Sequence, residues 1–300
     1  MTRLRSLIAL FALLLATPAC AQTPPAPAAT HDADPALWVV KDKDTTIYLF
    51  GTIHVLKPGL SWFDEGVKKA FDSSDQVVLE LVMPDAQAMQ ALVAEKGIAH
   101  DGVALTARLP EGKRAAYAKA VTDLGFPANA FDQMEPWFAA TNLSLLPLMK
   151  LGYNPANGPE QVITKAAADA HKPLIGLETA EQQLGYFDSL SMPAQIAFLD
   201  STVDELPKLS TEMNEMVDDW AQGQPDKLAK LLNDDLDASP EVKQALLVNR
   251  NKNWANWITE RMKTPGTVFI AVGAGHLAGA DSVLVQLDKL HHVKAERVQY

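Results

Sequence analysis

Short apolar runs, rich in β-branched and aromatic residues and bounded by polar segments, recur along the chain and predict strands. Residues 38–40 and 45–50 are two such runs, and the polar stretch Lys41–Asp44 between them is typical of a β-hairpin. The other predicted strands are residues 76–82, 173–177, 267–272 and 293–298. Several of these runs are apolar along their whole length, as in a sheet that is covered on both faces.

Helical periodicity fills most of the remaining chain, above all residues 192–262. Thr179 marks one helix start, because Gln182 follows three residues later and completes a capping box. Further helices are predicted over residues 62–71, 84–96, 111–124, 136–151, 158–170 and 281–290. The pattern therefore predicts an α/β fold, in which a mixed central sheet of about six strands is flanked by helices and carries a helical cap.

Composition narrows the classes of function. The chain has 300 residues, with 37 acidic and 26 basic side chains and a formal net charge of −11. This balance argues against a sequence-independent nucleic-acid binder and against adhesion to an anionic membrane. Past the N-terminal region, no apolar run reaches the roughly 18 residues that a membrane span needs. A single Cys excludes a disulfide scaffold and a cysteine-rich zinc module.

The N-terminal region has the features of an export signal. Two arginines near the start are followed by an uninterrupted apolar run over residues 7–16, and Ala19-Cys20-Ala21 fits a small-x-small cleavage site. We therefore expect a signal peptide over residues 1–21 and a periplasmic or secreted protein. The alternative is a lipid anchor on Cys20, which is disfavoured because Thr17 stands where a lipoprotein signal usually has Leu.

Residues 22–36 follow the predicted cleavage site and are rich in Pro, Ala and Asp. This composition is typical of a disordered spacer. The chain is therefore expected to divide into the signal peptide, this spacer and one domain over residues 37–300.

Two segments far apart in the chain share the pattern of a strand followed by Gly-x-x-His. They run from Gly51 to His54 and from Gly273 to His276. Glycine allows a sharp turn at the strand end, and Gly275 would let a substrate approach closely. Open α/β sheets bind ligands at this edge, so the two histidines are candidates for a shared site. The competing interpretation is that each histidine caps a helix or satisfies a hydrogen bond in the core.

Two carboxylates extend the candidate site. Glu80 interrupts an apolar strand, and Glu178 ends another. A buried carboxylate is normally paired, metal-bound or protonated, although the strand register could instead place either one, and Glu178 in particular, on a solvated edge. Two His with one or two Glu form a common donor set for Zn, Mn or Fe ions. The sequence contains no Gly-x-Ser-x-Gly elbow and no dinucleotide or phosphate-binding fingerprint.

A helical stripe precedes the second Gly-x-x-His segment. Leu247, Trp254 and Ile258 fall on this stripe, with Arg250 and Asn251 within or beside it. An arginine in this position could hold a carboxylate or a substrate oxyanion. The alternative is an arginine at the edge of the helix whose charged end reaches water.

The order and spacing of these motifs resemble the TraB/GumN family, which includes the Tiki metalloproteases. The resemblance covers about residues 37 to 300. The sequence departs from the family pattern at Pro159 and at His291-His292, neither of which touches the proposed ligands. The matching motifs are Leu49 to Val55, Leu79-Glu80, Pro136-Trp137, Gly158-x-Glu160, Gly176 to Thr179, Arg250-Asn251 and Val272 to Gly279.

The resemblance implies a fold related to the erythromycin esterases and the haem-binding ChaN proteins. It also implies that His54, His276 and Glu80 carry the site. We therefore expect a metal-dependent hydrolase, with a peptidase as the leading prediction, that holds Mn, Co or Zn and acts on a peptide or small-molecule substrate. Glu80 would be the third ligand or the base that activates water, and Arg250 would stabilise the oxyanion or orient Glu80. The residues predicted to line the substrate site are Gly51, Gly273, Gly275, Glu160, Glu178 and Asn251.

Two interpretations from other functional classes also fit the sequence. A non-catalytic protein of the same fold could use the two histidines to bind haem or another ligand, or could serve as an accessory protein of a polysaccharide pathway. A structural pseudoenzyme would show neither turnover nor ligand binding. Added divalent metal, a chelator and a haem titration discriminate among these readings.

Overall fold

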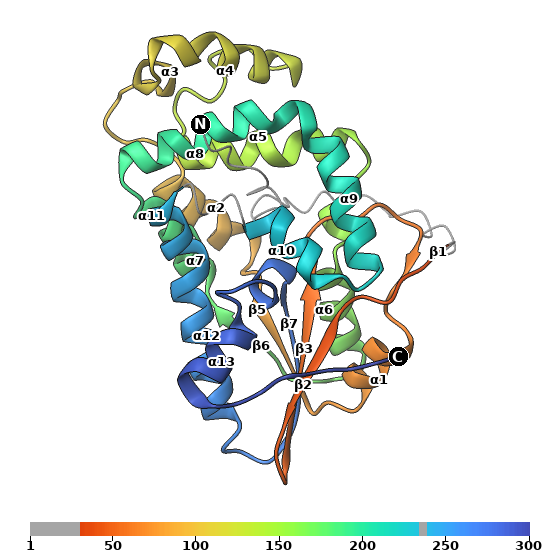
Figure 1. Cartoon of the computed structure of the whole chain (residues 1–300). Helices are drawn as coiled ribbons and strands as arrows, with labels where there is room; N and C mark the ends of the chain where they lie inside the picture. The colour runs from red at the N-terminus through yellow and green to blue at the C-terminus, as the bar shows by residue number, and fades with distance from the viewer. Residues whose placement is uncertain (1–30, 234–238) are drawn as a thin grey trace.

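A mixed six-stranded sheet forms the centre of the computed structural model, which describes residues 31–233 and 239–300 (Figure 1). Four neighbouring strands run parallel, whereas β2 pairs antiparallel with both β3 and β8. The predicted mixed α/β sheet is therefore confirmed. Across the sheet the strands are β6 (Leu174–Glu178), β5 (Gln76–Leu81), β7 (Gly266–Gly273), β3 (Thr45–Thr52), β2 (Leu37–Lys41) and β8 (Glu296–Arg297).

Alternation along the central strands builds two separate cores. In β7, Phe269 and Ala271 face one side of the sheet, while Val268, Ile270 and Val272 face the other. The first side is covered by α1 (Glu65–Asp72), α6 (Pro159–Asp169), α9 (Leu209–Ala221) and α10 (Pro225–Asn233). The second side is covered by α12 (Asn249–Arg261) and α13 (Val283–His291).

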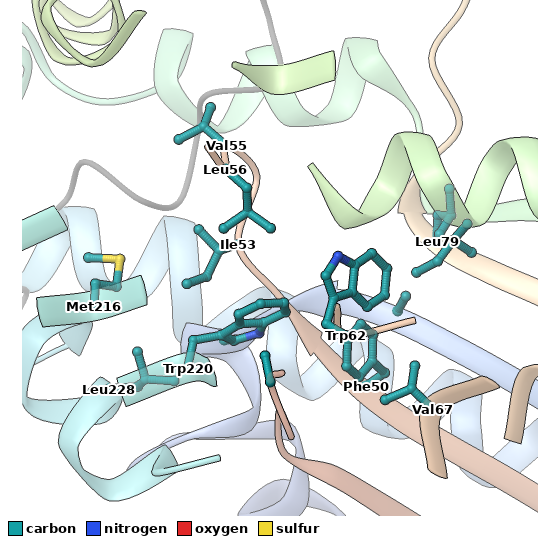
Figure 2. Packing of buried hydrophobic residues seen from close by; sticks show 14 of the residues in the cluster. Phe50, Ile53, Val55, Leu56, Trp62, Val67, Leu79, Met216, Trp220 and Leu228 are labelled. Atoms are coloured by element: carbon teal, nitrogen blue, oxygen red, sulfur yellow. The ribbon is translucent and has the colours of Figure 1, made fainter. Parts of the chain in front are cut away.

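Aromatic packing on the first side fixes the end of β3. The Phe50 ring stacks on Trp62 with 5.5 Å between ring centroids, and Trp220 packs against both rings (Figure 2). The Trp220 indole N–H donates a hydrogen bond of 2.7 Å to the Gly51 carbonyl. Helix α9 therefore holds the strand end from which the first Gly-x-x-His segment starts.

A third hydrophobic cluster forms the helical cap above the sheet. Helices α5 and α8 lie side by side there, and Trp137 stacks on Phe187 with 5.3 Å between ring centroids (Figure 1). The cap lies over the end of the sheet at which the parallel strands finish. Its helices are α2 (Ala86–Lys96), α3 (Leu105–Arg108), α4 (Glu111–Asp123), α5 (Pro136–Lys150), α7 (Ala180–Asp188), α8 (Met192–Glu205) and α11 (Pro240–Lys243).

Within residues 31–233 and 239–300, no helix combines the length and the apolar character that crossing a membrane requires. The predicted signal peptide, residues 1–21, and the alternative lipid anchor at Cys20 lie outside the described residues.

The predicted disordered spacer is wrong at its C-terminal end. Strand β1 (His31–Asp32) pairs in parallel with β4 (Leu60–Ser61), and Ala33 is buried in the first core. The Asp34 N–H also donates to the Ala221 carbonyl. Composition alone missed this order, because it is provided by backbone partners and a core that lie elsewhere in the chain.

Candidate functional site

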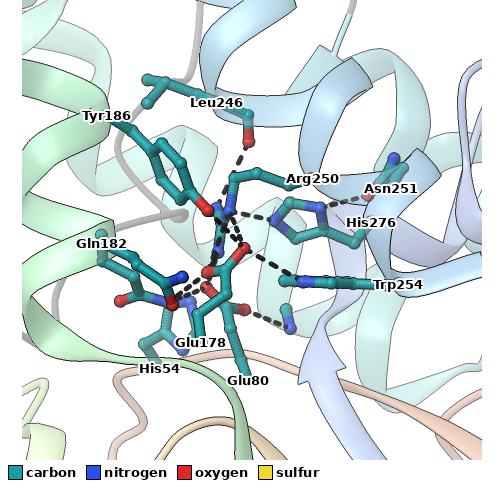
Figure 3. Close-up of polar contacts among 12 residues, drawn as sticks. His54, Glu80, Glu178, Gln182, Tyr186, Leu246, Arg250, Asn251, Trp254 and His276 are labelled. Carbon is teal, nitrogen blue, oxygen red and sulfur yellow. Dashed lines mark hydrogen bonds and ion pairs between the residues drawn. The ribbon is translucent and has the colours of Figure 1, made fainter. Parts of the chain in front are cut away.

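The polar residues predicted from strand ends meet at one edge of the sheet. The neighbouring parallel strands β6, β5, β7 and β3 end there, so the side chains at or after their carboxyl ends converge under the cap (Figure 3). Two helices add Glu160, from the start of α6, and Arg250, from α12. We call these six residues, His54, Glu80, Glu160, Glu178, Arg250 and His276, the polar cluster. Each of them is at most 7% exposed.

Arg250 lies at the centre of the polar cluster. Its Nη2 pairs with Glu80 Oε1 at 2.5 Å and with Glu178 Oε2 at 2.6 Å, and its Nε donates to Glu178 Oε1 at 2.9 Å. Burial opposes the charged form, but the two carboxylates outweigh it and hold the pKa of Arg250 above its usual range. The residue is fully buried, so the alternative of an arginine that reaches water is wrong.

Glu178 is saturated by donors from this chain. Besides Arg250, the Trp254 indole N–H donates to Oε1 at 3.0 Å and the Gln183 amide donates to Oε2 at 3.0 Å. The Tyr186 hydroxyl adds a longer bond of 3.4 Å to Oε1. The alternative of a solvated edge is therefore wrong for Glu178, and its contacts are those of a residue that fixes Arg250. A substrate-binding role for Glu178 stays a prediction.

Glu80 faces the space between the two Gly-x-x-His segments. Its Oε1 accepts from Arg250 and from Gln183, the latter at 2.9 Å, and its Oε2 accepts from the Gly273 N–H at 3.2 Å. Burial raises the pKa of Glu80, but Arg250 and the two histidines outweigh this effect and lower the pKa to about 2. The carboxylate is therefore ionised at neutral pH.

His276 is held as a neutral ring. Its Nδ1 lies 2.6 Å from Asn251 Oδ1, and the Asn251 amide nitrogen is fixed by the Asp281 carbonyl, so Nδ1 carries the hydrogen. Nε2 then accepts from Arg250 Nη1 at 3.2 Å. Burial and the Arg250 charge lower the pKa of His276 to about 3. Asn251, predicted to bind substrate, thus orients this histidine; the substrate-binding role stays a prediction.

His54 has an anionic partner instead. Its Nδ1 donates to Glu160 Oε1 at 2.7 Å, and the Thr52 hydroxyl donates to the same oxygen. Burial lowers the pKa of His54, but the Glu160 carboxylate outweighs burial and the net pKa is raised. The other carboxylate oxygen of Glu160 is buried and has no hydrogen-bond partner within the described residues.

Gly51 and Gly273 let the two Gly-x-x-His segments pack against each other. A Cβ built on Gly273 would lie 3.4 Å from His54 Nε2, 3.5 Å from Glu80 Oε2 and 3.6 Å from His276 Cδ2, so all three groups surround one point. A Cβ on Gly51 would lie only 3.1 Å from the Ala274 Cα, which makes the first segment pack directly on the second. Gly275 is buried in the turn that carries His276.

The chemistry of a metal site is present in part. His54 Nε2 and Glu80 Oε2 face the same point, and with His276 they supply the N, N and O donors that suit a divalent ion. The Nε2 of His276 is engaged by Arg250. In the part of the chain that the structure describes, no three His, Cys, Asp or Glu side chains are already arranged around one metal position.

Several residues of the site carried no signal strong enough for prediction. Thr52 lies inside the first Gly-x-x-His segment, whose pattern assigns it no role. Gln183 and Tyr186 follow the capping box on α7, where three-residue spacing places both on one helix face. A π-helix, Gln244–Val248, directly precedes α12, in which Arg250 is the second residue. The Leu246 carbonyl in that π-helix accepts from Arg250 Nη1 at 3.3 Å, so this irregular turn helps to hold the guanidinium.

Comparisons with known proteins follow the motifs of the site. The sequence model of the TraB/PrgY/gumN family matches residues 36–291. The chain is 24% identical over 250 residues to the uncharacterized protein YbaP of Escherichia coli (strain K12), covering 83% of this chain and 90% of that protein. The YbaP protein of Shigella flexneri matches with the same identity and coverage. No solved structure matches the chain.

Proposed function

Because the chain belongs to the TraB/PrgY/gumN family, we propose that it is a hydrolase with the polar cluster as its active site. The supporting observation is that His54, Glu80 and His276 surround one point beside Gly273. A peptide is the first substrate to test, because the family that the sequence resembles includes the Tiki metalloproteases. A small-molecule ester or amide is the next.

The proposed cofactor is a divalent ion, Mn, Co or Zn, held by His54 Nε2, Glu80 and His276. Such an ion lowers the pKa of bound water toward neutrality and so supplies a nucleophile without Ser or Cys. His54 Nε2 and Glu80 Oε2 already face one point, while His276 fits through its chemistry and has to exchange its bond from Arg250.

The remaining roles follow from the contacts of each side chain. Arg250 and Gln183 hold Glu80 Oε1, while Oε2 faces the point beside Gly273, and this geometry favours Glu80 as a ligand over Glu80 as the general base. Arg250 supplies a fixed positive charge for a developing oxyanion, and Glu178 holds that charge in place. Removing the charge at Arg250 therefore removes both stabilisation of the reaction and charge balance for the carboxylates.

A peptide-library cleavage screen, paired with metal analysis of protein purified without chelator, tests the proposal. We expect turnover that requires Mn, Co or Zn, stops with chelator and is lost in Glu80→Gln. Glu111→Gln, an exposed position on α4, is the matched control and should behave as wild type. A Soret band on haem titration without any turnover would contradict the hydrolase and support a haem-binding protein.

We also propose export to the periplasm or outside the cell, with cleavage after Ala21. The support is the sequence pattern of residues 1–21, which lie outside the described residues. Mass spectrometry of protein recovered from the periplasm should find Gln22 as the first residue. A diacylglycerol-modified Cys20 at the N-terminus would instead establish the lipid anchor.

A further inference from the structure

Glu160 is the one member of the polar cluster that reaches it from a loop-to-helix junction. It is the second residue of α6, directly after Pro159, and it is 4% exposed. A Cβ on Gly158 would collide with the His54 carbonyl oxygen, so only glycine lets the start of α6 lie against the backbone of the first Gly-x-x-His segment. The Asn157 side chain donates to the Leu56 carbonyl at 3.2 Å and ties the junction to the backbone just after that segment. The carboxylate is thus held rigidly behind His54.

The two oxygens of Glu160 are used very unequally. Oε1 accepts hydrogen bonds from His54 Nδ1 and from the Thr52 hydroxyl, whereas Oε2 has no partner within the described residues although it is buried. A carboxylate that served only to stabilise the fold would have both oxygens paired, as Glu178 does. An unpaired buried carboxylate oxygen lowers stability. The negative charge is therefore retained in spite of its effect on stability.

We propose that Glu160 is a positioning residue for His54: it holds the ring with its hydrogen on Nδ1, directs the Nε2 lone pair toward Glu80 and Gly273, and strengthens His54 as a ligand for a divalent cation. Carboxylates behind metal-binding histidines fix the tautomer and raise the basicity of the ligand. This inference rests on the proposed function, because it needs a metal at His54. It goes beyond that function in predicting that His54 is the stronger metal ligand of the two histidines, because a neutral amide, Asn251, stands behind His276.

Two substitutions separate orientation from charge. In Glu160→Gln the amide oxygen replaces Oε1 and still accepts from His54 and Thr52, while the amide nitrogen takes the place of the unpartnered Oε2. The tautomer is kept and the charge is lost. In Glu160→Ala both the acceptor and the charge are lost. Glu111→Gln is the matched control, because it removes one carboxylate charge at an exposed position on α4, outside the polar cluster.

Calorimetric titration of metal-free protein with Mn²⁺ and Zn²⁺ measures the effect of charge. We expect Glu160→Gln to bind about 10- to 100-fold more weakly than wild type, and Glu111→Gln to bind with nearly unchanged affinity. Glu160→Gln should fold with a melting temperature somewhat below that of wild type, because its buried amide N–H groups find no acceptor at the position of Oε2. Wild-type affinity in Glu160→Gln would overturn the inference alone. Absence of metal binding by the wild-type protein would overturn the proposed function and this inference together.

Nitrogen-15 NMR of the histidine side chains, without metal, measures orientation, and His54→Gln assigns the signals. At alkaline pH, where both histidine rings are neutral, wild type and Glu160→Gln should both show His54 with its hydrogen on Nδ1. Glu160→Ala should shift this ring toward the Nε2–H form, which a merely structural role would not do. An unchanged His54 tautomer in Glu160→Ala would overturn the positioning role.

Discussion

The two Gly-x-x-His segments have the same local pattern and opposite surroundings. Both follow parallel strands that are neighbours in the sheet, and both deliver a buried histidine to the same edge. Behind His54 stands a carboxylate that raises its pKa, whereas His276 stands between an amide and a guanidinium and its pKa falls to about 3. The motif therefore fixes where each histidine lies, and residues remote in the chain decide what its ring can do.

Removing Arg250 should have the largest effect on the surroundings of both histidines. Arg250→Ala leaves Glu80 and Glu178 buried without their cation, which we expect to destabilise the fold by about 3–5 kcal/mol. Arg250→Lys should lose nearly as much activity, because an ammonium does not reproduce the planar fork that bonds two carboxylates and His276. Urea denaturation and turnover measure both effects. Lys252→Ala, exposed on the same helix, is the control and should shift stability by less than about 0.5 kcal/mol. If Arg250→Lys matched wild type in both assays, the proposed role of the Arg250 guanidinium would be contradicted.

Glu80→Gln tests the group that the two histidines share. The shape is kept, and the charge that faces the point beside Gly273 is removed. We expect turnover to fall by about 100-fold or more, with the fold retained and stability lowered by about 1–3 kcal/mol through the weakened contact with Arg250. Circular dichroism checks the fold and a cleavage assay the rate. Full activity in this variant would reduce Glu80 to a structural residue.

In metal-free protein, the contributions of His54 and His276 to the free energy of unfolding should depend on pH in opposite directions. His276 stays neutral down to about pH 3 when folded but takes up a proton near pH 6.5 when unfolded, so it destabilises the fold progressively as pH falls through this window. Relative to His276→Gln, wild type should lose about 2 kcal/mol between pH 6.5 and 5. His54, with a raised pKa, should give the reverse: relative to His54→Gln, wild type becomes more stable as pH falls through the folded pKa. Chemical denaturation at three pH values measures both differences, and slopes of the same sign would refute the asymmetry.

Gly51→Ala should give the smallest effect, because it changes only how closely the segments pack. The new methyl group would meet the Ala274 Cα at 3.1 Å, where backbone has to move. We expect a loss of about 1 kcal/mol, at the lower end for overpacking, with a modest fall in activity. Gly185→Ala, on a helix with open space at the Cβ position, is the control and should be neutral or stabilising. Equal thermal shifts in the two variants would show that the segments do not need this contact.

Periodicity and strand-end chemistry predicted much of this molecule. The apolar runs predicted the strands of the six-stranded sheet. Because neighbouring parallel strands end at one edge, they also predicted that Glu80 and the two histidines lie together. The partners of Arg250 were harder to predict from the sequence. Glu80 and Glu178 lie 170 and 72 residues away in the chain, and only the packed sheet brings them next to the guanidinium.

Other features depend on geometry that has no local signature. The carboxylate behind His54 comes from the start of α6, 106 residues downstream, and nothing in the periodicity of either segment links the two. The π-helix before Arg250 is likewise a departure from the regular pattern that predicted a helix. The order of residues 31–36 comes from strand β4 and the Ala221 carbonyl, so the composition of that segment concealed it.

The place of β7 in the sheet has a consequence for biosynthesis. This strand is among the last to leave the ribosome, yet it lies between β5 and β3 and pairs with both. Until it inserts, the strands that carry His54 and Glu80 have no hydrogen bonds joining them, and His276 has not been delivered. Pairing over such a sequence separation is a slow, late step in folding. A nascent or truncated chain that ends before Gly266 therefore lacks the strand that joins β3 to β5, so the polar cluster can assemble only after synthesis is nearly complete.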